Sequence, residues 1–338
     1  MAVVCSYGLV MPEPNAEPKK KSPISLLFLL ILENYKNLSR KTKTLLLAVV
    51  LVPVLAFFAA RGVFLRRSPL VVVTDASFRM LYGPRRLEKM ENMLSIRLFR
   101  RVIPVYVNEN AGQDQVSFAA EDAGQNPLAV LFPHRYMGAG DYYKESRPDT
   151  PVYIASGRNQ NSKAKEAVSF IRTDVKTDYY RAGLCAALFA GEGSIIFISD
   201  EVVSNENREA FLEGLRAQDY AKTPNWGRYN TDFLSDYNLA CVVIAGPVGE
   251  FFEQRPNIPV ILFSWIDPDF TPRSVKVIFD DSPYALALKG SKLFSSAGAE
   301  GEVLISSAPT VLKGRIEEKG VFKKLESLVK REYQPTPP

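Results

Sequence analysis

Polar and aromatic side chains recur where apolar runs of this sequence end. Asp75 follows the run PLVVVT, His134 follows PLAVLFP, and Trp265 and Asp267 end the run PVILFSWID. Aromatic faces stack on a sugar or base, and carboxylates accept hydrogen bonds from hydroxyl groups, so the set predicts binding of a small polar ligand. For any one residue alone, a loop or capping role is an equal alternative. The candidate ligand-binding residues are Asp75, Ser77, Phe78, Phe132, His134, Ser156, Arg158, Asp200, Glu201, Gly246, Trp265 and Asp267.

The same sequence offers little for catalysis. His134 is its only histidine, and no nucleophile-elbow motif accompanies it. Zinc-ligand spacing, a P-loop and an EF-hand loop are all absent from the sequence. Gly191-Glu192-Gly193 precedes its strand, whereas a dinucleotide-binding loop follows one. The acidic pairs Asp280-Asp281 and Asp267-Asp269 are typical of solvated turns. We therefore expect neither enzyme activity nor a cofactor or metal site.

One stretch, Thr173–Leu215, shows how the candidate residues are positioned. Asp178 is expected to cap a helix over Tyr179–Ala190, which Gly191 and Gly193 end. The run SIIFIS, residues 194–199, is long enough for a buried strand and too short for a helix. A second helix is expected over 205–215. The strand, the acidic residue Asp200 at its carboxyl end and the following helix form one unit of an open α/β sheet. Such sheets bind ligands beyond the carboxyl ends of their strands.

The rest of the body alternates in the same way, which predicts mostly parallel sheets covered on both faces. The further strands are expected at 69–74, 102–107, 127–132, 151–155, 239–245, 259–265, 274–279 and 303–306. The further helices are expected at 80–101, 113–122, 248–254, 283–294 and 316–333.

The stretch Thr173–Leu215 resembles the opening of the second lobe in type I periplasmic binding proteins and lactose-repressor-like effector domains. The matching residues are Asp178, Gly183, Gly191, Gly193 and Phe211-Leu212-Glu213-Gly214-Leu215. Asp267 matches a family position that often binds a sugar or ribose hydroxyl. The order of elements along the chain is also similar to that of nucleoside-binding basic membrane proteins. In those proteins an Asp and a Phe near the first strand contact the ligand, and Asp75 and Phe78 occupy those positions here. The sequence departs from that family in lacking a lipobox cysteine and an Asn-rich first loop.

The resemblance implies an α/β fold of two doubly wound parallel-sheet lobes that form a clamshell, and we expect an N-terminal transmembrane helix ahead of it. The first lobe is expected at 69–157 plus about 268–300, and the second at 158–267 plus about 301–333. Chain order predicts that the lobes are joined near 156–158, 267–270 and 280–283, because no Gly/Ser-rich or Pro-rich linker separates them.

Sixteen uncharged apolar residues, Leu45–Ala60, precede the body. With the flanking residues, 44–65 forms a helix of roughly 31–33 Å, which matches the hydrocarbon core of a bilayer. A transmembrane helix that anchors the chain is therefore predicted; a cleaved signal and a buried core helix are the alternatives. A signal peptide fits poorly, because more than forty residues precede the segment and no Ala-x-Ala site ends it.

Charge is concentrated at the membrane end of the chain. Residues 1–43, expected to be a basic and partly disordered segment, hold seven Lys or Arg against three Glu. With Arg61, Arg66 and Arg67 counted, the formal charge of +5 leaves −2 for residues 68–338, so no nucleic-acid partner is expected. The three cysteines have no metal or redox spacing, and Cys185 and Cys241 are expected in the core.

Two classes of function remain open. The first is a membrane-anchored solute-binding or ligand-sensing protein in the cytoplasmic membrane, with its body facing the periplasm or exterior. Its partners would be a small-molecule ligand and an ABC-type permease or membrane signalling protein. The second is a ligand-free bilobed interaction module on the membrane. Charge asymmetry across the apolar segment is too small to fix orientation, so orientation rests on the resemblance.

Overall fold

The structure is a computed structural model that describes residues 39, 49, 51–52, 55–56, 61–158, 168–227, 238–246, 257–294 and 301–334. The chain divides into two units, Met1–Val63 and Phe64–Pro338. In the first unit, the described residues between 49 and 56 are helical, and residues 61–66 form a helical stretch that enters the second unit. Most of Leu45–Ala60 and the expected helix 248–254 lie outside the described residues. Among the helices that are described, none is both long and apolar enough to cross a membrane.

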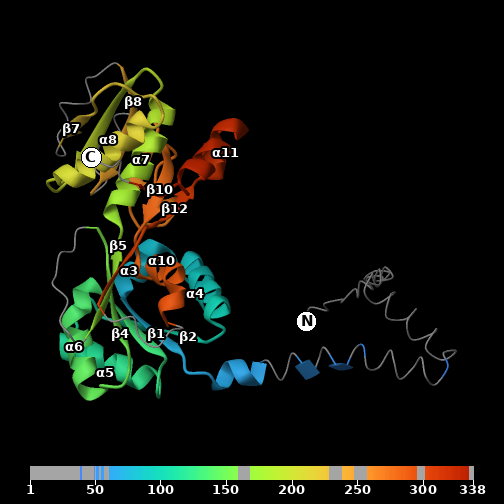
Figure 1. Cartoon of the computed structure of the whole chain (residues 1–338). Coiled ribbons are helices and arrows are strands. Elements are labelled where there is room, and N and C mark those ends of the chain that lie inside the picture. The colour runs from blue at the N-terminus through green and yellow to red at the C-terminus, as the bar shows by residue number, and fades with distance from the viewer. Residues whose placement is uncertain are drawn as a thin grey trace, which may run out of the picture. The chain divides into compact units, whose positions relative to one another are not determined.

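The second unit, the body, contains two six-stranded sheets, one in each lobe (Figure 1). The first sheet has the order β11-β5-β4-β3-β1-β2, and all its pairs are parallel. Its strands are β1 (Leu70–Asp75), β2 (Val102–Val107), β3 (Ala129–Pro133), β4 (Val152–Ser156), β5 (Ser169–Thr173) and β11 (Glu302–Ile305). The second sheet has the order β12-β10-β9-β8-β6-β7, with only β12 antiparallel to its neighbour. Its strands are β6 (Ser194–Ser199), β7 (Asn225–Gly227), β8 (Leu239–Ala245), β9 (Val260–Phe263), β10 (Val275–Asp280) and β12 (Ala308–Val311).

Helices cover both faces of the first sheet. Alternate residues of β1 point to opposite faces, so Leu70 and Val72 pack with α3, α4 and α10, while Val71 and Val73 pack with α5 and α6. These helices are α3 (Ala76–Tyr82), α4 (Pro84–Leu98), α5 (Gln113–Ala123), α6 (Met137–Ser146) and α10 (Pro283–Lys289). Short 3-10 turns follow some strands and helices: η1 (His134–Tyr136), η3 (Pro268–Phe270), η4 (Ser291–Phe294) and η5 (Lys313–Arg315).

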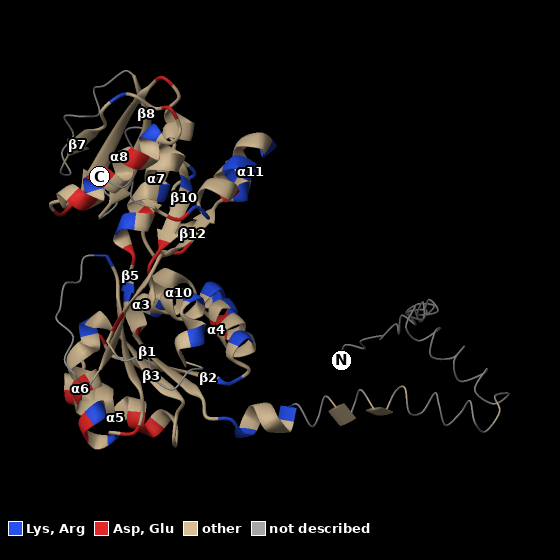
Figure 2. Cartoon of the chain, in the orientation of Figure 1, with Lys and Arg blue, Asp and Glu red and all other residues tan. Residues whose placement is uncertain are grey.

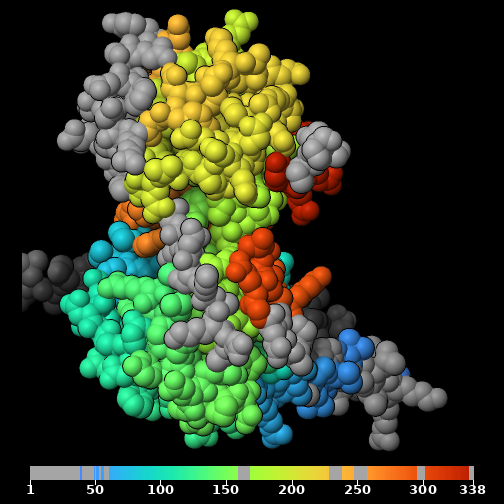
Figure 3. Space-filling model, turned by 60° about the vertical axis from the view of Figure 1, so that its left-hand side comes forward, coloured from blue at the N-terminus to red at the C-terminus, as the bar shows by residue number. Residues whose placement is uncertain are grey.

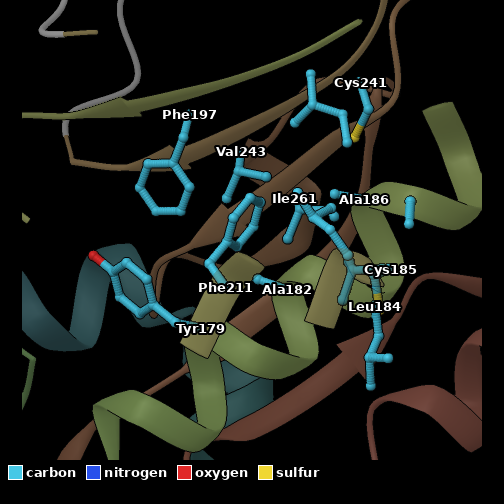
Figure 4. Packing of buried hydrophobic residues seen from close by; sticks show 14 of the residues in the cluster. Tyr179, Ala182, Leu184, Cys185, Ala186, Phe197, Phe211, Cys241, Val243 and Ile261 are labelled. Carbon is cyan, nitrogen blue, oxygen red and sulfur yellow. The ribbon is translucent and has the colours of Figure 1, made fainter. Parts of the chain in front are cut away.

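The second lobe is built on α7 (Val175–Ala190), α8 (Asn205–Arg216) and α11 (Lys319–Leu328), which cover one face of its sheet. Figure 4 shows Phe197, Phe211 and Ile261 of this core beside the small residues of α7. Helices α7 and α8 meet at two glycines: a Cβ on Gly183 would lie 2.3 Å from the Phe211 carbonyl oxygen, and one on Gly214 only 2.1 Å from that of Tyr180. Only glycine permits this approach of two helix backbones.

The chain crosses between the lobes three times. It passes from β5 to α7 at Thr173–Val175, from β10 to α10 at Asp280–Pro283 and from β11 to β12 at Ile305–Ala308. Orange and red C-terminal residues therefore appear in both lobes (Figure 3). The crossings expected near 156–158 and 267–270 are wrong, because Ser169–Thr173 forms β5 beside β4 and Val275–Asp280 pairs within the second sheet. Residues 158–173 thus belong to the first lobe, and 268–280 to the second.

Two local expectations also differ from the structure. The expected helix 80–101 is divided at Gly83, which has a positive φ of 86° and separates α3 from α4. Helix α7 begins at Val175, one turn earlier than expected. Its cap is Asp174, whose side chain accepts a hydrogen bond from the Thr177 amide. Asp178 is instead a fully buried residue of the first helical turns.

Candidate functional site

A cleft of about 600 Å³ opens where the strands of both lobes end. From the first lobe it is lined by residues that end or follow β1, β3 and β4, and from the second by residues that end or follow β6, β8 and β9. The crossing at residues 281–283 forms part of the lining as well. Carboxyl ends of parallel strands are the usual ligand side of an open α/β sheet, so the topology itself positions this cleft.

Most of the residues expected at the site meet here, although they come from segments far apart in the sequence. Those that line the cleft are Asp75, Ser77, Phe78, His134, Arg158, Asp200, Gly246 and Trp265. Several lining residues were not expected from the sequence, among them Thr74, Arg135, Phe263, Ser264, Asp281 and Ser282.

Four expected residues lie elsewhere. Phe132 is fully buried in the core of the first lobe, and Ser156 is buried at the end of β4. Glu201 lines a separate small cavity of about 120 Å³ beside Trp226. Asp267 faces Gly83, where an added Cβ would meet its carboxylate, and it caps η3 by accepting from the Asp269 amide. Phe132 and Ser156 lie within β3 and β4 and are buried in the sheet, whereas Glu201 and Asp267 lie in the segments that follow β6 and β9.

Asp75 has two roles at the end of β1. One carboxylate oxygen accepts a hydrogen bond from the Phe78 amide at 2.8 Å and so caps α3. The other lies 3.5 Å from the Arg135 guanidinium, which extends from η1 after β3. The cap holds this side chain at the cleft wall, and the second oxygen keeps acceptor capacity toward the cleft.

Arg158 is a nearly buried cation at the cleft. Its side chain is 10% exposed and its guanidinium stacks over the Phe263 ring at 4.1 Å. The Arg158 backbone amide donates to an Asp281 carboxylate oxygen at 3.0 Å, and its Nη2 lies 3.7 Å from the same oxygen. Among the described residues, the buried Nη1 has no hydrogen-bond partner. Buried guanidinium nitrogens are normally paired, so this donor is available for a ligand.

Asp280 and Asp281 correct the expectation that this acidic pair is a solvated turn. Both are buried, because the chain passes between the lobes at this point. Asp280 is 2.8 Å from Arg86 and accepts a hydrogen bond from the Tyr82 hydroxyl at 3.0 Å. Burial raises the pKa of Asp280, while the Arg86 charge opposes that rise. The position of the pair after an apolar strand and before Ser282-Pro283 was the sequence signal for a buried crossing.

Aromatic rings close one side of the cleft. The Phe78 ring of the first lobe lies 5.0 Å from Trp265 of the second lobe and stacks on Tyr82 at 4.9 Å. Arg86 donates to the backbone oxygens of Trp265 and Ile266, each at 3.1 Å. Helices α3 and α4 are thereby tied to the segment after β9.

His134 lies at the cleft with a lowered pKa, because burial and then the nearby Arg172 charge both disfavour its protonated form. It is therefore neutral near pH 7. Cys185 and Cys241 are buried in the core as expected, and burial raises the pKa of Cys185 to about 12. Within the described part of the chain, no three His, Cys, Asp or Glu side chains are grouped to hold a metal.

Two solved structures share this fold over nearly their whole length. A transcriptional activator of the comK gene from Bacillus halodurans aligns with a TM-score of 0.55 at 12% identity, covering 78% of this chain and 96% of that one. An ABC transporter system solute-binding protein from Conexibacter woesei aligns with a TM-score of 0.53 at 11% identity, covering 78% and 95%. No family model and no curated protein sequence matches the chain. The chain therefore has the fold of these two proteins, the two-lobed α/β fold of type I periplasmic binding proteins.

Proposed function

We propose that the cleft binds a small polar ligand with hydroxyl groups, such as a sugar or a nucleoside-like molecule. The observation that carries the proposal is that six strand ends from two lobes surround one cleft of about 600 Å³. Small-molecule sites typically have volumes of about 300–1,000 Å³ and few, well-placed polar groups.

The lining supplies the groups that such a ligand needs. The Asp75 carboxylate accepts hydrogen bonds from ligand hydroxyls, while Arg158 Nη1 and the buried Thr74 hydroxyl offer donors. Phe78 and Trp265 present ring edges and faces against which a sugar or base packs. His134 is neutral near pH 7, so it adds a donor or an acceptor without adding charge.

The lobes close on the ligand by a hinge motion. Three chain crossings connect them, and the cleft lies beside those crossings. Rotation about a few element-terminal residues is the usual way in which such clefts close. Closure would bring Asp200 and Gly246 of the second lobe toward a ligand that first contacts Asp75 and Arg158.

The body is held at the cytoplasmic membrane by a transmembrane helix over residues 44–65, with residues 1–43 inside and 68–338 outside. The uncharged run Leu45–Ala60 and the helical residues within it support this anchor. A permease or a membrane signalling protein is then the partner that recognises the ligand-bound body. Alkaline phosphatase fused after Tyr333 should be active; an inactive fusion, with a cytoplasmic reporter active at the same point, rejects this orientation.

A ligand-free interaction module is the second candidate. The contact between Phe78 and Trp265 favours it, because these rings join the two lobes directly. In that case the cleft would serve only to shape the surface that a partner recognises.

Native mass spectrometry of the full chain purified from membranes distinguishes these functions. A solute-binding protein releases a small molecule on activation, and the released compound then raises the melting temperature of the washed protein. A chain with no adduct, and no thermal shift across a library of sugars and nucleosides, rejects ligand binding and favours the interaction module.

A further inference from the structure

The last turn of α4 and the residues after it form an exposed surface of arginine and apolar side chains. We call this surface the α4 base and define it by Met93, Ile96, Arg97, Phe99, Arg100 and Arg101. Ile96 is 77% exposed and Phe99 is 43% exposed. In Figure 2, Lys and Arg residues of α4 and of the short helical stretch ahead of β1 are coloured blue.

Phe99 holds an unusual backbone conformation on this surface. It ends α4 with a positive φ of 50°, a left-handed conformation that bulky residues rarely adopt. Its amide donates to the Ile96 carbonyl, and the next amide donates to Ser95. A polar residue or glycine would end the helix at lower cost, so an aromatic residue is unusual at this position.

The start of the body packs directly on the α4 base. The Phe64 ring lies 5.7 Å from Phe99, and the Arg67 guanidinium lies 5.0 Å above the same ring. Arg100 Nη1 donates to the Ser68 carbonyl oxygen at 3.1 Å. The chain that follows the apolar run is thereby fixed to this surface.

Only a few residues of the sequence separate the apolar run Leu45–Ala60 from Phe64, which packs on Phe99. Phe64 is four residues beyond Ala60, and residues 61–66 are helical. Four helical residues advance the chain by only about 6 Å. If the apolar run lies in a bilayer, as proposed above, the α4 base must lie within reach of the lipid headgroups.

The chemistry of the surface fits phospholipid. Arg66, Arg67 and Arg101 are exposed, and the hydrogen bonds of Arg97 and Arg100 go to backbone carbonyl oxygens rather than to carboxylates. Guanidinium groups bind phosphate oxygens in a bidentate manner. Basic residues are attracted to a membrane surface that carries anionic lipids. Exposed aliphatic and aromatic side chains between such arginines suit the boundary between headgroups and acyl chains.

We propose that the α4 base binds the surface of the bilayer, with its arginines on the phosphates of anionic phospholipids and Ile96 and Phe99 inserted among the headgroups. This inference rests on the proposed membrane anchor and goes beyond it. The first lobe, which contains α4, is then held on the membrane, while the second lobe remains free to move about the three crossings.

The test uses the full chain in a Cys5→Ser background, since Cys185 and Cys241 are buried. An environment-sensitive fluorophore is attached at Ile96→Cys, and in a matched control at Phe118→Cys, an apolar position of α5 that is 63% exposed. The protein is reconstituted into vesicles of phosphatidylcholine, with or without about 30% phosphatidylglycerol, that carry nitroxide-labelled lipid. We expect at least twofold stronger quenching at position 96 than at 118, and a further increase with phosphatidylglycerol.

Charge variants test whether the arginines cause the contact. Changing Arg66, Arg97 and Arg101 to Gln should reduce quenching at position 96 at least twofold in the anionic vesicles. The matched control changes Lys319, Lys323 and Lys324 of α11 to Gln, which removes the same charge from another exposed surface and should leave quenching unchanged. Circular dichroism and melting temperature confirm that each variant is folded.

Flotation of the vesicles separates this inference from the anchor itself. A chain that floats with the vesicles, but is quenched no more at 96 than at 118, overturns the α4-base proposal and leaves the anchor standing. Equal loss of quenching in the Arg and Lys variants also overturns it, because the effect would then follow net charge. A chain that does not float overturns both the anchor and the inference that depends on it.

Discussion

The Arg86 guanidinium lies 2.8 Å from the Asp280 carboxylate and joins the two lobes beside the cleft. Arg86 belongs to α4 of the first lobe, and Asp280 ends β10 of the second. The Tyr82 hydroxyl supplies a further hydrogen bond to the same carboxylate. Because Asp280 is buried, this pair matters more for stability than an exposed pair would.

Arg86→Met should destabilise the body by about 3–5 kcal/mol at neutral pH, since it leaves a buried carboxylate without its counter-charge. Loss of Arg86 also raises the pKa of Asp280 further, so the destabilisation should shrink as the pH falls and the carboxyl gains its proton. Denaturant unfolding at pH 5 and pH 8 measures both effects. Arg216→Met, which breaks an exposed pair with Glu209, is the control and should cost less than about 1 kcal/mol. Equal losses for the two variants would contradict the buried role of Asp280.

A second prediction concerns the contact between α7 and α8 at Gly183 and Gly214. Gly183→Ala and Gly214→Ala place a Cβ against the backbone of the facing helix and should each cost more than about 2 kcal/mol. Gly320→Ala in α11 meets nothing within 4 Å and should be neutral or stabilising by about 0.5–1 kcal/mol. Thermal unfolding of the three variants tests the packing. A tolerated Gly183→Ala would mean that the two helices are further apart than described.

Asp178 makes stability depend on pH. It is fully buried beside the last crossing and accepts from the Ser307 amide, with both Arg158 and Arg181 among the charges that act on it. Burial raises the pKa of Asp178 to about 7, an effect that the hydrogen bonds and arginine charges only partly oppose. Lys289, whose pKa is lowered mainly by burial, also interacts with it. Between pH 4 and pH 7 the folded chain therefore binds more protons at this site than the unfolded chain does.

From that difference, the contribution of Asp178 to stability is greatest below about pH 4 and is lost as the pH rises through about 7. The slope cannot exceed about 1.4 kcal/mol per pH unit. Asp178→Asn keeps an acceptor for Ser307 and removes the titration. The difference in unfolding free energy between the variant and the parent should thus change with pH over this range. A constant difference from pH 4 to pH 8 would show that Asp178 does not titrate there.

The sequence predicted individual strands better than it predicted the division into lobes. The limits of β2, β6 and β8 match the expected runs, because each is a short apolar segment bounded by glycine or polar residues. Strand β5 was missed, since Ser169 and Arg172 interrupt its apolar pattern. Because β5 was not expected, the first crossing was placed one strand too early, and residues 158–173 were assigned to the second lobe.

The candidate site was predictable mainly where it depends on polar or aromatic residues that follow apolar runs. Asp75, Phe78 and Trp265 were found because strand tips of parallel sheets converge. Asp281 was missed because the acidic pair was expected to be a solvated turn, although this carboxylate meets Arg158 at the crossing after β10. Phe263 was missed because it lies inside an apolar run. Asp267 was expected in the cleft but turns to Gly83, which leaves room for its carboxylate because it has no Cβ.

The central claim is that Asp75 binds a polar ligand in the cleft between the lobes. Calorimetric titration of the full chain with its identified ligand tests it most directly, using Asp75→Asn, which can still cap α3. The control is Asp149→Asn, an exposed position ahead of β4 at the opposite end of the strand from the cleft. The account predicts a loss of about 1–3 kcal/mol, roughly five- to hundredfold in affinity, for Asp75→Asn, and no change for the control. Parent-like affinity in a folded Asp75→Asn protein would contradict the claim.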